Sequence, residues 1–71
     1  LNAEVQIAIN QLNAKKAILN QMQRQLVRMQ TLSESGAISR SQLDIAQTDY
    51  ATARADYMAQ QQVVAKAKAA Y

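Results

Sequence analysis

The sequence has no cysteine, proline, tryptophan, phenylalanine or histidine, and it has a single glycine. With 71 residues, no disulfide and so few bulky aromatic side chains, the chain cannot build a large globular core. We therefore do not expect an enzyme. The absence of proline removes the residue that most often interrupts helices, and the abundant alanine, glutamine and leucine favour helix formation. Long helices are the expectation.

Side chains that could carry chemistry are sparse and scattered. Ser39 beside Arg40 lacks a general base, so catalysis is not expected, and neither is a cofactor. Eight basic residues are interleaved with five acidic ones, which argues against a nucleic-acid interface despite the net charge of +3. No apolar run reaches the length of a membrane span. The acidic side chains nearest to a helical pattern are too dispersed for a metal site: Glu4, Asp44, Asp49 and Asp56.

Helical periodicity stops only near the middle of the chain. Gly36 follows the last periodic residue of the first half, where a left-handed residue would close a helix. Ser39 and Gln42 then fit a capping box, and Ile38 and Leu43 occupy the two positions of a hydrophobic staple. A connection this short predicts two neighbouring antiparallel helices.

Both halves carry an apolar seam with the mean spacing of 3.5 residues that is typical of coiled coils. Lys15 alone interrupts the first seam: Leu1, Val5, Ala8, Leu12, Leu19, Met22, Leu26 and Met29. Gln60 alone interrupts the second: Leu43, Ala46, Tyr50, Ala53, Tyr57, Val64, Ala67 and Tyr71. The predicted fold is all-α, an antiparallel two-helix coiled-coil hairpin about 50 Å long. We expect one domain over residues 1–71, with helices at about 2–35 and 39–71 and a tip turn at 36–38.

The two polar interruptions fall in adjacent layers when the seams are paired around Gly36. Lys15 would then face Tyr57, and Leu12 would face Gln60. Such a polar layer can fix the register of a coiled coil at some cost in stability. Alternatively, Lys15 only lays its aliphatic stem along Tyr57.

Seven larger apolar residues lie off the seam. On so thin a rod they predict lateral packing against copies of the hairpin or against other helices: Ile7, Ile9, Ile18, Val27, Ile45, Met58 and Val63.

Near the tip, Arg24 and Arg28 lie one turn apart on a helix, away from the seam. They could serve only as cations at a helix C-terminus, or Arg28 could offer its planar donors to a partner's carbonyls or carboxylates. Leu32 has a similar pair of roles. It could make the apolar contact of a Schellman motif or anchor a partner.

Arg28, Leu32 and Ser39 form an Arg-x3-Leu-x6-Ser pattern across the turn, and residues 28–44 as a whole resemble the hairpin tip of periplasmic adaptor proteins, also called membrane fusion proteins. In tripartite efflux pumps and type I secretion systems, these adaptors link an inner-membrane transporter to a TolC-like outer-membrane channel. The resemblance implies that Arg28, Leu32 and Ser39 bind the channel, and that six hairpins assemble in the full-length protein. It also implies a periplasmic location with an inner-membrane anchor.

The turn Gly36-Ala37-Ile38-Ser39 with Leu43-Asp44 is somewhat more similar to MacA-type adaptors, which serve ATP-driven (ABC) transporters, than to the adaptors of proton-driven (RND) pumps. The lipoyl-like, β-barrel and membrane-proximal domains of the family are not in this sequence, so we expect a segment of a longer protein. Two other classes remain as alternatives. One is a generic antiparallel coiled-coil spacer or oligomerisation arm. The other is an amphipathic helix at a membrane surface, which would need a basic polar face that this sequence lacks.

Overall fold

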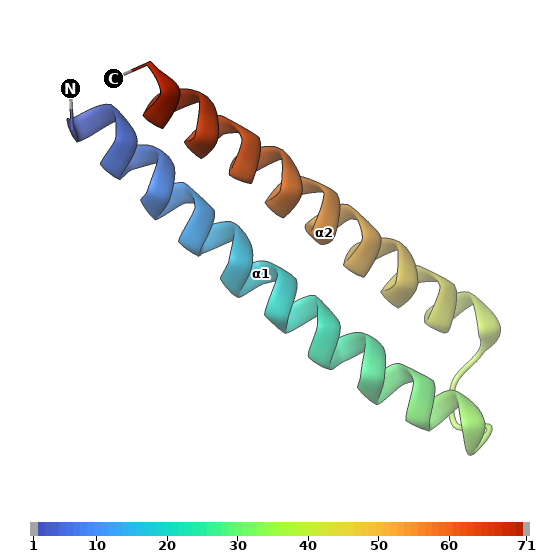
Figure 1. Ribbon diagram of the computed structural model, residues 1–71. Helices are drawn as coiled ribbons and strands as arrows, with labels where there is room; N and C mark the ends of the chain where they lie inside the picture. The colour runs from blue at the N-terminus through green and yellow to red at the C-terminus, as the bar shows by residue number, and fades with distance from the viewer. Residues whose placement is uncertain (1, 71) are drawn as a thin grey trace.

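The chain forms a helical hairpin. The computed structural model describes residues 2–70, and for Asn2 it describes the backbone alone. Helix α1 spans Asn2–Glu34 and helix α2 spans Arg40–Ala69, and the two pack side by side in opposite directions, which brings the start of α1 and the end of α2 to the same end of the hairpin (Figure 1). The part of the chain described contains no strand. The prediction of an all-α two-helix hairpin is confirmed.

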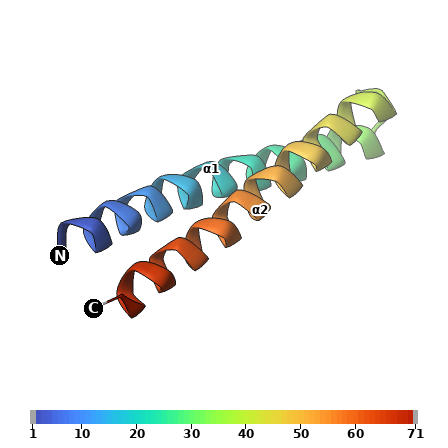
Figure 2. The same ribbon diagram turned by 90° about the horizontal axis from the view of Figure 1, so that it is seen from above.

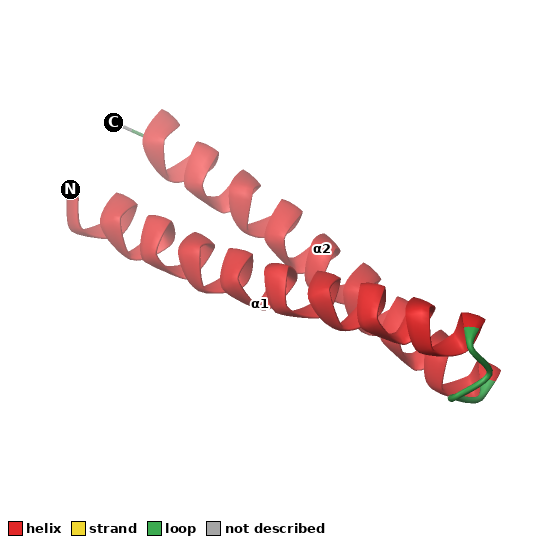
Figure 3. Cartoon of the chain, turned by 90° about the horizontal axis from the view of Figure 1, so that it is seen from below, coloured by secondary structure: helices red, strands yellow, loops and turns green. Residues whose placement is uncertain are grey.

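The hairpin is a thin rod whose principal extents are 53 × 13 × 11 Å. Seen from above, α2 crosses α1 at a small angle (Figure 2). The helices of a coiled coil cross in this way because they wind around each other. A single loop at one end joins the helices (Figure 3). A rod of two helices has no third layer, so most side chains off the seam are exposed to solvent.

The buried side chains follow the predicted seam. Four small residues among those described are buried, with exposed fractions of 7% or less: Ala8, Ala46, Ala53 and Val64. The other seam positions within residues 2–70 are half-buried: Val5, Leu12, Lys15, Leu19, Met22, Leu26, Met29, Leu43, Tyr50, Tyr57, Gln60 and Ala67. The coiled-coil character of the hairpin is therefore confirmed. Leu1 and Tyr71, the ends of the two predicted seams, lie outside the described residues.

The helix ends differ from the sequence-based bounds by one or two residues. Helix α1 ends at Glu34, and α2 begins at Arg40 because Ser39 is its N-cap, with extended backbone angles (φ −77°, ψ 159°). Helix α2 ends at Ala69, whereas the sequence placed its end at 71. Neither helix, over the residues that the structure describes, is apolar enough to cross a membrane.

Six of the seven off-seam apolar residues are exposed, by between 47% and 59% of their surface: Ile7, Ile18, Val27, Ile45, Met58 and Val63. The seventh, Ile9, is half-buried because its heptad position lies directly beside the seam. The sides of the rod thus present apolar surface to solvent, and lateral packing against copies or other helices stays a prediction.

Candidate docking tip

The first helix ends in a Schellman motif centred on Gly36. Gly36 has a positive φ of 77°, and its amide donates to the Ser33 carbonyl at 3.0 Å. The Ala37 amide donates to the Leu32 carbonyl at 2.9 Å, and the same carbonyl accepts from the Ser35 hydroxyl at 2.8 Å. These bonds satisfy carbonyls that a helix end leaves without partners, so the loop leaves α1 in a defined direction.

The second helix begins with a capping box. The Ser39 hydroxyl accepts from the backbone amide of Gln42 at 3.2 Å, and the backbone amide of Ser39 donates to Gln42 Oε1 at 3.0 Å. Ile38 and Leu43, the positions of the predicted hydrophobic staple, are both half-buried. Both sides of the turn are therefore fixed by hydrogen bonds, and the tip is a defined surface.

Replacing Ser39 with alanine is expected to lower the free energy of unfolding by about 0.5–2 kcal/mol, because the first turn of α2 loses its side-chain acceptor. Ser41→Ala is the matched control, since Ser41 is exposed two residues further on and has no hydrogen-bond partner among the described residues. Thermal unfolding followed by circular dichroism measures both variants. Equal melting temperatures for the two would show that the cap contributes nothing.

The three residues implied by the resemblance gather at the tip end of the rod but differ in their surroundings. Arg28 is exposed, and its guanidinium has no hydrogen-bond or ion-pair partner within the part of the chain described. Leu32, one turn further on, is half-buried, and Ser39 is exposed on the other side of the turn. Of the three, Arg28 has donors free for a partner, whereas the Ser39 hydroxyl already caps α2.

Sequence reasoning missed how the polar side chains of the last turns of α1 are used. The Thr31 hydroxyl donates to the Val27 carbonyl at 3.1 Å, and Ser33 is half-buried. The Ser35 hydroxyl thus donates to a carbonyl of the last turn of α1, whereas the Thr31 hydroxyl adds a second donor to a carbonyl inside the helix. The serine- and threonine-rich run before Gly36 was the available signal.

The polar layer in the middle of the rod is built mainly by Gln60. Its amide nitrogen donates to the Ala8 carbonyl at 3.1 Å and to Gln11 Oε1 at 3.2 Å. Gln60 therefore bonds to α1 close to its predicted partner Leu12. Gln11 directly precedes Leu12 in the sequence, and Ala8 lies one helical turn before it. Lys15 is half-buried and makes no hydrogen bond or ion pair with any described residue, so its aliphatic stem, and not its charge, belongs to this layer.

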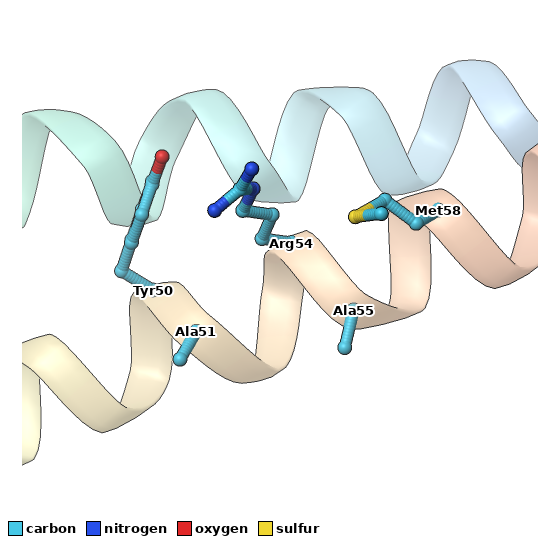
Figure 4. A pocket seen from close by; sticks show the side chains of 5 residues that line it. All are labelled: Tyr50, Ala51, Arg54, Ala55 and Met58. Carbon is cyan, nitrogen blue, oxygen red and sulfur yellow. The ribbon is translucent and has the colours of Figure 1, made fainter.

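A shallow groove lies on one side of α2, away from the tip. Ala51 and Ala55 leave space beside the longer side chains of Tyr50, Arg54 and Met58, and Tyr50 and Arg54 point up toward α1 (Figure 4). The groove has a volume of about 350 Å³ and is open to solvent. It could seat apolar side chains of a partner, but it does not enclose a small molecule in the way that a ligand pocket does.

No group of histidine, cysteine or carboxylate side chains in residues 2–70 is close enough to hold a metal ion. Comparisons of the chain with protein-family models, with curated proteins and with solved structures found no match in any of the three. The functional conclusion therefore depends on the geometry of the hairpin and on the pattern of residues at its tip.

Proposed function

We propose that this hairpin is the docking arm of a periplasmic adaptor of a tripartite efflux pump or type I secretion system. In this proposal the tip contacts a TolC-like outer-membrane channel. The rod spans part of the distance between this channel and an inner-membrane transporter, and so helps to link the two. The observation that supports it best is the Arg28 guanidinium, which is exposed and has no partner within residues 2–70, beside a tip whose two helix ends are both capped.

The chemistry of each tip residue gives it a separate role in this proposal. Arg28 offers planar donors to the carbonyls or carboxylates at the ends of channel helices. Leu32 supplies apolar surface on the same side of α1, because residues four apart lie on one helix face. Ser39 acts as a positioning residue, since its hydroxyl is engaged in the capping box. Gly36 lets the chain turn between these residues without strain.

The wider setting also belongs to the proposal and comes from the sequence resemblance alone. The full-length protein would be a MacA-type adaptor in the periplasm, anchored to the inner membrane and working with an ATP-driven transporter. Six hairpins would surround the transport path. No cofactor and no enzymatic step enters this function.

Replacing Arg28 with alanine is expected to weaken channel binding by at least tenfold while leaving helicity unchanged, because the side chain has no partner within the described hairpin. The hairpin is fused to a hexamer-forming carrier so that weak single contacts add up. Binding to a purified TolC-like channel is measured by surface plasmon resonance, and helicity by circular dichroism.

Two further variants control for charge and position. Arg24→Ala removes the same side chain one turn further from the tip, and we expect it to bind as the unmodified hairpin does. Arg28→Lys keeps the charge but loses the planar fork of donors, and we expect an intermediate loss. If Arg28→Ala binds like the unmodified hairpin, the docking role is wrong. The generic coiled-coil spacer would then be favoured, which predicts tolerance at the tip and sensitivity at Leu19 or Leu26.

A further inference from the structure

The sulfur atoms of this chain lie in two different environments. The chain has three methionines and no cysteine, so thioethers are its only sulfur groups. Met22 and Met29 are half-buried at seam positions between the helices, whereas Met58 lies off the seam and is 51% exposed. Because oxidation of a sulfur group depends on its exposure, Met58 is the thioether that an oxidant in solution reaches most readily.

The two environments also differ in what oxidation would change. A thioether is apolar, and the sulfoxide formed from it is polar. At Met22 or Met29 the new oxygen would lie between the two helices, where a polar group without a hydrogen bond destabilises the fold. At Met58 the oxygen would stay in contact with water on the outer side of α2. The rod can therefore accept an oxygen atom at Met58 and remain folded.

Arg54 provides a hydrogen-bond donor for that oxygen. It lies four residues before Met58, on the same face of α2, and both side chains line the α2 groove. Figure 4 shows them on the same side of the helix, with the sulfur of Met58 turned toward Arg54. Arg54 is exposed and has no hydrogen-bond or ion-pair partner among the residues that the structure describes. A guanidinium only donates, and a thioether is a weak acceptor, so Met58 becomes a good acceptor for Arg54 only after oxidation.

We infer that Met58 is a site of reversible oxidation by a peroxide, with Arg54 as the positioning residue that donates to the sulfoxide oxygen. The sulfur attacks one oxygen of hydrogen peroxide, the O–O bond breaks, an S–O bond forms, and the second oxygen leaves as water. The sulfur loses two electrons, and the peroxide gains them. A methionine sulfoxide reductase reverses the change by oxidising two thiols to a disulfide, with release of water. Oxidation thus makes the rim of the groove polar while the seam and the tip stay as they are.

Peroxide treatment of the 71-residue chain tests the site. Peptide mass spectrometry follows the oxidation of each methionine with time. We expect Met58 to oxidise about fivefold faster or more than Met22 and Met29 in the folded chain, and all three to oxidise at similar rates in urea, where exposure no longer differs. Equal rates in the folded chain would contradict the inference.

Two variants check which thioether reacts first. Met58→Leu keeps the side-chain volume and should slow the consumption of the first equivalent of peroxide by the same factor. Met29→Leu is the matched control at the seam, and we expect it to consume that equivalent as the unmodified chain does. Circular dichroism should show unchanged helicity once Met58 alone is oxidised. A loss of helicity at that stage would mean that the rod does not tolerate the modification.

The role of Arg54 needs a readout that exposure of Met58 alone would not change. In the chain oxidised only at Met58, we expect the NMR signal of the Arg54 Nε–H group to shift, and the corresponding signals of Arg24 and Arg28 on α1 to stay in place. Treatment with reductases specific for each sulfoxide epimer, with dithiothreitol as the thiol, should return the Arg54 signal to its first position. An Arg54 signal that does not respond to oxidation would rule out its positioning role. The inference does not depend on channel docking, because Met58 and Arg54 lie on the side of α2 away from the tip.

Discussion

Ala53→Asp is expected to unfold the hairpin at room temperature. Ala53 is 5% exposed at the seam between the two helices, and an aspartate there would place a carboxylate in a seam position that is occupied by an apolar side chain. An uncompensated buried charge costs about 3–5 kcal/mol. A small domain has about 0.05–0.15 kcal/mol of stability per residue, so this change removes much or all of the total. Circular dichroism at 222 nm against temperature measures the loss.

Ala55→Asp is the matched control for this prediction. Ala55 is exposed on the outer side of the same helix, two residues from Ala53, so the variant carries the same side chain with the same change in helix propensity. That change costs about 0.7 kcal/mol or less. If both variants melt at the same temperature, the seam does not hold the helices together.

The hairpin was predictable from the sequence because one interaction dominates it. The spacing of 3.5 residues marks the seam, and the seam decides which side chains are buried, including Ala46 and Ala53. The turn was equally predictable, because each of its parts has a strong local signature: a glycine at the left-handed position, a serine cap, and a glutamine three residues later. Local rules suffice where neighbouring residues make the contacts.

Contacts between distant residues were less predictable. The sequence placed Gln60 opposite Leu12. It could not show that the side-chain amide of Gln60 donates to the Ala8 carbonyl and to Gln11, because a long side chain can reach several acceptors.

The sequence predicted which residues form the candidate docking site, but not which of their side chains have hydrogen-bond partners. The pattern singled out Arg28, Leu32 and Ser39 together. That Arg28 has no partner within the described residues, while the Ser39 hydroxyl is engaged, follows from three-dimensional packing and the cap. The Arg28 side chain is therefore available to a partner, whereas Ser39 shapes the tip. For this reason the loss of Arg28 tests the proposed docking role more directly than the loss of Ser39.

Gly36→Val is expected to lower the free energy of unfolding by about 2 kcal/mol or more, because a β-branched residue strongly disfavours the left-handed backbone conformation. Gly36 has a φ of +77°, and a Cβ built there would meet no atom within 4 Å. The cost therefore comes from the backbone and not from crowding. For a chain of this size each 1 kcal/mol corresponds to a melting-temperature shift of about 4–8 °C.

Gly36→Asn isolates the backbone effect. Asparagine also adds a Cβ and a polar side chain, but it tolerates the left-handed region better than other residues do, so we expect about half the loss of Gly36→Val or less. Thermal unfolding by circular dichroism ranks the three proteins, with glycine the most stable and valine the least. Valine as stable as asparagine would contradict the left-handed turn. In the hexamer-fused hairpin, Gly36→Val should also weaken channel binding, since a changed turn moves Ser39 and the start of α2 relative to Arg28.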